Sequence, residues 1–272
     1  MGSAPGEIVT PLPLLYQSFI SMAITSMVTA IFLSNVYYST KMLLISYKKP
    51  IFQLCFIQSI LGAITNLVLL ITFFYFDAGC SFRVYFAATL NLISMTCIDL
   101  IMLNKAYYCQ SRSNWVLGIG VTAQAARFVA GGVNIGFTGV FVTSLYGCGS
   151  IINTVTAITV IATEFFLNLF LSICFISSVY GRWKVVKTRL HSALLTDGLI
   201  YFLSTSITSI TIVILVLLQV LGDNSPILFN ISWAVASKLM VEQLKHASHI
   251  GKELAKGPSH SNQQEKTPIT MS

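Results

Sequence analysis

The chain has 272 residues, of which 55% are hydrophobic and only 9% are charged, and its mean hydropathy is +0.78. Soluble domains carry roughly 25% charged residues, so this composition excludes an ordinary water-soluble globular protein. The net charge of +7 does not indicate a nucleic-acid-binding protein, because the basic residues lie in short turns and in the C-terminal tail. We therefore expect one integral membrane domain, residues 1–256, followed by a disordered cytoplasmic tail, residues 257–272.

Seven apolar segments predict an all-α bundle of seven transmembrane helices, because each is near or above the about 20 residues that a helix needs to cross a bilayer. The segments are Leu15 to Tyr38, Ile51 to Phe76, Val84 to Tyr107, Trp115 to Val142, Ile151 to Tyr180, Leu199 to Leu221 and Ile227 to Leu244. Residues 1–13 carry neither the basic stretch nor the cleavage site of a signal peptide, so we expect the first helix to be retained.

The distribution of lysine and arginine predicts which side of the membrane each loop faces, because cytoplasmic loops are enriched in both. With the N-terminus outside, thirteen of the 16 basic residues fall in inner loops and in the tail. They are Lys41, Lys48, Lys49, Lys105, Arg112, Arg182, Lys184, Lys187, Arg189, Lys245, Lys252, Lys256 and Lys266. An even number of helices would place some of these groups outside, so we predict an outer N-terminus and a cytoplasmic C-terminus.

Beyond the seventh segment, apolar residues recur at helical spacing with lysines between them. These apolar residues are Leu244, Ala247, Ile250 and Leu254. The pattern predicts a short amphipathic helix on the inner membrane surface or, equally, a continuation of the seventh helix.

One face of the third helix carries Asn91, Met95, Asp99, Met102 and Lys105. Such a face normally points into the bundle, which makes Asn91 and Asp99 candidate ligand-binding or switch residues. Asp99 can bind a cation, pair with Lys238, or make a purely structural contact between helices.

Asp99, Arg127, Glu164 and Lys238 lie inside the predicted spans, and each is a functional candidate because a charge in lipid is costly. Counted from the span ends at 1.5 Å per residue, Arg127 and Glu164 lie at depths within roughly 10 Å of each other. This predicts an ion pair between them, either structural or part of a ligand site. Lys238 has Glu242 one turn further on as a candidate partner.

Two cysteines fall on the predicted outer face, Cys80 before the third helix and Cys148 between the fourth and the fifth. Oxidising conditions outside the cytosol permit a disulfide there, and it would hold the second outer loop over the end of the third helix. The remaining cysteines show no CxxC pair and no cluster with zinc-ligand spacing, so we expect no metal site.

This layout resembles that of a G-protein-coupled receptor: an outer cysteine opens helix three, a second lies in the next outer loop, and basic residues follow helices three and five. The resemblance is one of topology, because residues 103–107 read LNKAY where rhodopsin-like receptors carry Asp-Arg-Tyr, and the last two spans lack proline. It implies a receptor-like protein of the plasma membrane that senses an extracellular or membrane-borne small ligand. Signalling to a cytoplasmic protein would involve Lys105, Arg182, Lys184, Lys187 and Arg189.

Three other functions remain open from the residues. In an intramembrane enzyme acting on a lipidic or terpenoid substrate, Asp99 and Glu164 would serve as acid and base, although the sequence places them at different depths. Polar residues at 204–211 can line a transport path. Lys238 is similar in position to the retinal-binding lysine of rhodopsins. No Walker loop, GxSxG, HExxH or dinucleotide fingerprint is present, so we expect no cofactor.

Overall fold

The fold was analysed in a computed structural model of the whole chain. It describes residues 11–45, 47–74, 79–110, 112–142, 148–151, 153–183, 201, 204–205, 207–212, 214–216, 218, 220 and 227–255, some near element ends by backbone alone. The long helices are α1 (Pro11–Ile45), α2 (Pro50–Phe74), α3 (Cys80–Cys109), α4 (Asn114–Phe137), α5 (Thr154–Trp183) and α7 (Phe229–Ala255). Two strands, β1 (Gly139–Val142) and β2 (Cys148–Ile151), separate α4 from α5.

Five helices in the described part of the chain are long and apolar enough to cross a membrane. They cover Phe19–Ile45, Pro50–Phe73, Cys80–Tyr108, Asn114–Phe137 and Thr154–Cys174. A shorter apolar helix, Ile207–Val216, lies within the sixth predicted segment, and α7 carries more charged and polar residues than the other five. The all-α, multi-pass membrane architecture is confirmed at this level. The described residues contain five such spans, and they do not test the finer prediction of seven spans with an outer N-terminus.

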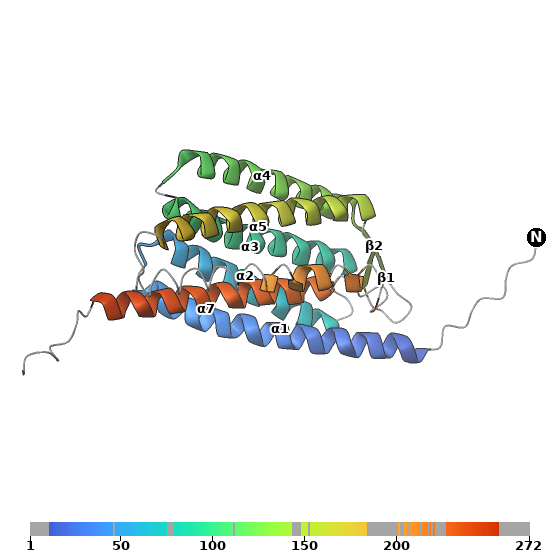
Figure 1. Cartoon of the computed structure of the whole chain (residues 1–272). Coiled ribbons are helices and arrows are strands. Elements are labelled where there is room, and N and C mark those ends of the chain that lie inside the picture. The colour runs from blue at the N-terminus through green and yellow to red at the C-terminus, as the bar shows by residue number, and fades with distance from the viewer. Residues whose placement is uncertain are drawn as a thin grey trace, which may run out of the picture.

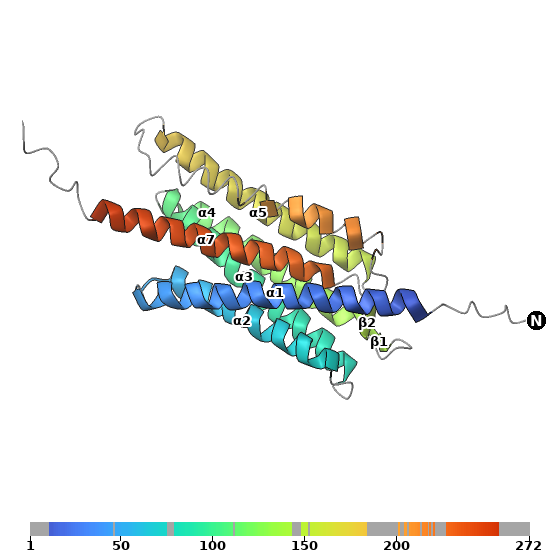
Figure 2. The same ribbon diagram turned by 90° about the horizontal axis from the view of Figure 1, so that it is seen from below.

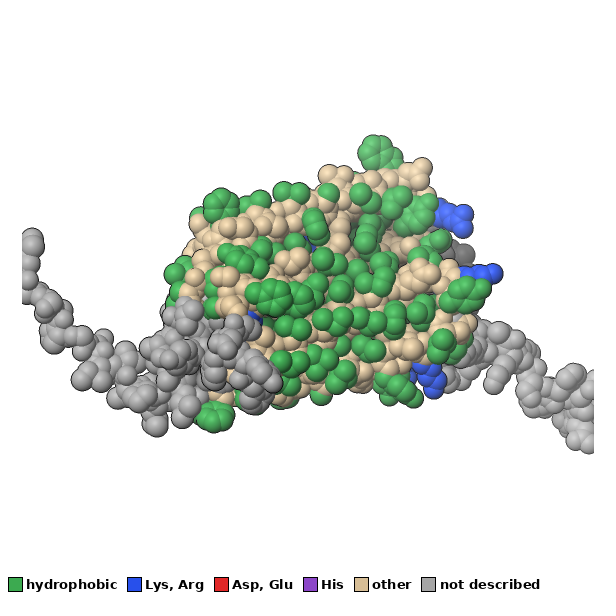
Figure 3. Space-filling model, turned by 180° about the vertical axis from the view of Figure 1, so that it is seen from behind, with side chains coloured by type: hydrophobic (Ala, Val, Ile, Leu, Met, Phe, Trp, Pro, Cys, Tyr) green, Lys and Arg blue, Asp and Glu red, His purple; other side chains and the backbone are tan. Residues whose placement is uncertain are grey.

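The helices lie side by side in one bundle, as two views at right angles show (Figures 1 and 2). One end of the bundle holds the β1–β2 hairpin and the start of α1. The turn from α1 to α2, the turn from α3 to α4 and the last turns of α7 lie at the opposite end, which we call the basic end. Lys and Arg side chains protrude there, while the face between the two ends is mainly hydrophobic (Figure 3). This is the distribution expected of a helix bundle in lipid.

The core joins α1, α2, α3 and α7 through large apolar side chains and a few polar contacts. The ring of Phe32 packs on that of Trp233 with centroids 4.7 Å apart, and Gly62 of α2 lets Phe32 approach closely. Trp233 Nε1 donates a hydrogen bond to Ser94 Oγ at 2.9 Å, and Asn35 Nδ2 donates to Ser237 Oγ at 2.8 Å. Contacts of this kind are typical of membrane bundles, in which buried polar groups must find partners within the protein.

The hairpin corrects the sequence prediction for the fourth and fifth spans, which were expected to include residues 139–142 and 151. Helix α4 ends at Phe137, and β1 then pairs antiparallel with β2, Gly139 opposite Ile151 and Val142 opposite Cys148. Tyr85 Oη of α3 donates to the carbonyl oxygen of Thr138 at 3.0 Å. The apolar residues of β1 continue the hydrophobic run of α4 although the helix has ended. The fourth span predicted from hydropathy is therefore longer than α4.

The end of α7 decides between the two predictions for residues 244–254. The helix is continuous from Phe229 to Ala255, so these residues continue α7 and do not form a separate surface helix. The predicted tail, residues 257–272, lies outside the described residues.

Candidate functional site

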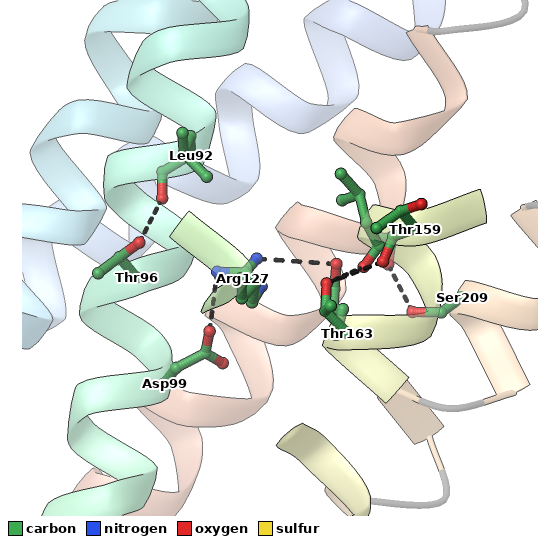
Figure 4. A network of polar contacts seen from close by, with 10 residues as sticks. Leu92, Thr96, Asp99, Arg127, Thr159, Thr163 and Ser209 are labelled. Carbon is green, nitrogen blue, oxygen red and sulfur yellow. Dashed lines mark hydrogen bonds and ion pairs between the residues drawn. The ribbon is translucent and has the colours of Figure 1, made fainter. Parts of the chain in front are cut away.

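Arg127 of α4 lies between two acidic side chains that come from different helices. Its Nη1 is 2.9 Å from Asp99 Oδ2 on α3, and its Nη2 is 3.7 Å from Glu164 Oε2 on α5. Figure 4 shows the guanidinium between α3 and α5, with Asp99 on one side of it. The side chains of Arg127 and Asp99 are 4% and 5% exposed, whereas that of Glu164 is 25% exposed. We call these three residues the charge cluster.

The charge cluster confirms one sequence prediction and identifies the partner of Asp99, which the sequence left open. The predicted Arg127–Glu164 ion pair is present. The partner of Asp99 is Arg127 and not Lys238. The two acids therefore meet at one guanidinium, although counting from span ends placed them at different depths. That count ignores the tilt of the helices and the length of an arginine side chain, which spans the difference.

Two further residues border the cluster and were not singled out in the sequence. Gln124, one turn before Arg127 on α4, is 6% exposed and lies beside Asp99. Tyr201 is 4% exposed and lies near all three charges. Gln124 shares a helical face with Arg127, which is a signal that the sequence offered. Tyr201 carried no such signal, because nothing in the pattern fixes which residue of the sixth segment faces α4.

A cavity of about 340 Å³ extends from the charge cluster toward the hairpin end of the bundle. Arg127 and Glu164 line one end of it, and Arg83 and Ser150 line the other. Its walls are mainly apolar and come from α2, α3, α4, α5 and α7. Asn91, the candidate ligand residue on α3, is one of the lining residues. The volume is at the lower end of the range of small-molecule sites, which starts near 300 Å³.

Lys105 connects α3 to α7 at the basic end. Its Nζ donates a hydrogen bond to Gln243 Oε1 at 3.0 Å and lies 3.5 Å from Met240 Sδ. The face of α3 that carries Asp99 therefore also carries Lys105, six residues further along the helix. Asp99 belongs to the charge cluster, and Lys105 makes the contact with α7. A displacement of α3 changes both contacts.

Lys238 lies apart from the cavity. Its Nζ is 3.1 Å from Glu242 Oε1, one turn along α7, and 5.5 Å from the centroid of the Tyr38 ring. The Nζ of Lys245 lies 4.7 Å from the centroid of the same ring. The predicted Lys238–Glu242 pair is thus confirmed. Lys238 is not among the described residues that line the cavity.

The remaining predicted residues are placed only in part. Arg182 lies in the last turn of α5, described by its backbone alone, and Lys184, Lys187 and Arg189 lie outside the described residues. Cys80 begins α3, with its Sγ 3.5 Å from the carbonyl oxygen of Phe141 on β1. The free thiols of the described side chains are those of Cys55, Cys97 and Cys174.

Comparison with known proteins adds no relative: no family model, no curated protein and no solved structure matches this chain. Among the described residues no group of three or more His, Cys, Asp or Glu could hold a metal ion. The fold and the site define a multi-pass, helical membrane protein with a buried charge cluster at one end of an internal cavity.

Proposed function

We propose that the chain is a seven-span, receptor-like membrane protein with its N-terminus outside and its basic end in the cytosol. The sixth and seventh spans would be the segment around 207–216 and the first part of α7, in addition to the five apolar helices described. The gathering of basic residues at the end opposite the hairpin supports this orientation. The hairpin and the cavity then face the outside.

A disulfide between Cys80 and Cys148 is part of this proposal. Cys148 is opposite Val142 in the hairpin register, and the neighbouring residue Phe141 contacts Cys80 Sγ through its carbonyl oxygen. The hairpin therefore brings the backbone of Cys148 close to the start of α3. A bond there would fix the hairpin beside the outer end of the cavity, in a compartment that permits disulfides.

One observation carries the receptor proposal: the cavity and the basic end share α3 as a common element. A ligand in the cavity contacts Glu164 and Arg127, whose ion pair with Asp99 fixes α3 against α4. The same helix is held to α7 by Lys105. A ligand that favours one arrangement of the cluster thereby shifts the population of arrangements at the basic end, where a cytoplasmic partner would bind.

The test measures whether a change in the cavity reaches the basic end. Spin labels are attached at Asn114→Cys, at the start of α4, and Ala247→Cys, on α7, two exposed positions, and the distance between them is recorded by pulsed electron paramagnetic resonance in lipid nanodiscs. We expect Lys105→Met to broaden or shift the distribution, because the contact of α3 with α7 is lost. Glu164→Gln should shift it in the same direction, although Glu164 lies in the cavity.

Lys48→Met, in the exposed turn before α2, serves as the matched loss of a lysine and should leave the distribution unchanged. A distribution that responds to Lys105→Met but stays fixed in Glu164→Gln would contradict the proposal, because the cavity would then be uncoupled from the basic end.

A further inference from the structure

The charge cluster contains two acids and one base. Arg127 contacts both Asp99 and Glu164, so with all three groups ionised the cluster has one negative charge in excess. Charges in the apolar interior of a bundle are costly unless they are paired, so this excess favours either a further cation beside the cluster or a proton on one of the acids. With both acids ionised, the cluster is therefore one cation short of balance within the described residues.

Glu164 is the group at which a further cation can be accommodated. Asp99 is 5% exposed and does not line the cavity, whereas Glu164 is 25% exposed and does. Its contact with Arg127, at 3.7 Å, is also longer than that of Asp99, at 2.9 Å. An ammonium group entering the cavity thus reaches Glu164 without displacing the shorter pair.

The rest of the cavity favours an organic cation over an inorganic one. About 340 Å³ is far more than one ion needs, and the walls beyond Glu164 are mainly apolar, with Leu92 and Ile161 among them. Such walls favour a hydrocarbon chain, because its apolar area is removed from water. Asn91 and Ser232 add polar groups that can orient a ligand.

We propose that the cavity binds a small amphipathic amine, with its ammonium group paired to Glu164 and its apolar body along the cavity toward Arg83. The inference rests on the proposed function, because it names the ligand class of the same cavity. The rival is an amphipathic anion held by Arg83 at the other end, where the guanidinium lies 4.1 Å from the centroid of the Phe73 ring.

The experiment compares three probes of eight carbons each that carry different head groups: octylamine, octanol and octanoate. Thermal unfolding of the full chain in lipid nanodiscs is followed with each probe at the same concentration, because a ligand that binds only the folded state raises Tm. We expect octylamine to raise Tm by about 2 °C or more beyond octanol. Octanoate should not exceed octanol. Sodium chloride at the same concentration should have no such effect.

Two variants locate the effect. Glu164→Gln should abolish the difference between octylamine and octanol, while Glu242→Gln, a carboxylate outside the cavity, should keep it. The comparison of probes on the unaltered protein needs no variant, so the test stands even where Glu164→Gln unfolds.

Equal shifts for octylamine and octanol, a larger shift for octanoate, or a shift reproduced by sodium chloride would each overturn the amine inference. A larger shift for octanoate would leave the receptor proposal intact with a different ligand class. An amine that binds while the distance between the basic-end labels stays unchanged would overturn the receptor proposal and not this inference.

Discussion

Replacement of the Arg127 side chain is expected to lower the stability of the protein strongly. It is almost fully buried and is the contact that Asp99 and Glu164 share. Removing one partner of a buried ion pair leaves an uncompensated charge, which costs far more than the pair itself contributes. The loss of Arg127 leaves two acids facing each other.

We expect Arg127→Met to lower the free energy of unfolding by about 3–5 kcal/mol, because methionine fills the space but leaves Asp99 and Glu164 unpaired. Unfolding in detergent with increasing sodium dodecyl sulfate measures it. Lys48→Met, an exposed loop residue, should change stability by less than about 0.5 kcal/mol. Adding Asp99→Asn to Arg127→Met should restore part of the loss. No restoration would show that Asp99 does not depend on Arg127.

The charge cluster shows how far single residues can be predicted from sequence. The Arg127–Glu164 pair was predictable, because helical rise converts residue position into depth. The Asp99–Arg127 pair was not, because the rotation and tilt of α3 and α4 are set by packing. Gly120 and Gly131 of α4, against Leu103 and Leu92 of α3, fix that packing. Sequence patterns carry no direct record of such contacts.

The glycines of α4 are of two kinds: at some, an added side chain would collide with α3, and at others it would extend into open space. A Cβ on Gly120 would collide with the buried side chain of Leu103 on α3, whereas a Cβ on Gly118 meets nothing within 4 Å. Small residues at a helix contact let two membrane helices approach closely. Gly120 therefore sets the distance between α3 and α4, and with it the position of Arg127 beside Asp99.

We expect Gly120→Ala to destabilise the protein by about 1–3 kcal/mol, because overpacking forces α3 and α4 apart. Gly118→Ala lies on the same helix and makes the same chemical change in open space. It should be neutral or stabilising by up to about 1 kcal/mol, since alanine has the higher helix propensity. Unfolding titrations of the two variants test the difference. Equal effects would mean that Gly120 does not control this contact.

The hairpin and α7 show why element boundaries were harder to predict than element existence. Residues 139–142, GVFV, continue the apolar run of α4, and hydropathy alone does not separate a strand from a helix end. The continuation of α7 to Ala255 follows from the periodicity of its apolar residues, a pattern that equally fits a separate surface helix. For the hairpin a neighbouring helix contributes, because Tyr85 of α3 bonds to Thr138, and α7 contacts α1 through Lys245 and the Tyr38 ring as it continues.

In the described part of the chain, the connections between helices lie at two opposite ends of the bundle, and Lys and Arg side chains protrude at one of them (Figures 1 and 3). A bilayer oriented by the positive-inside rule would therefore have the turn between α1 and α2 in the cytosol and the hairpin outside. The cavity lies in the half nearer the hairpin, with Arg83 and Ser150 at that end. Its accessibility to an extracellular ligand depends on this orientation, which single-site labelling can measure.

Introduced cysteines at Lys48→Cys and Asn153→Cys report the two ends, since both positions are exposed and lie between helices. On intact cells a membrane-impermeant maleimide should label Asn153→Cys above the level of the unaltered chain, and should label Lys48→Cys only after permeabilisation. Labelling of the unaltered chain gives the background from the native thiols, which include the buried Cys55 and Cys97 and the partly exposed Cys174. The reverse pattern would place the hairpin in the cytosol, and an extracellular ligand could then reach the cavity only through the bilayer.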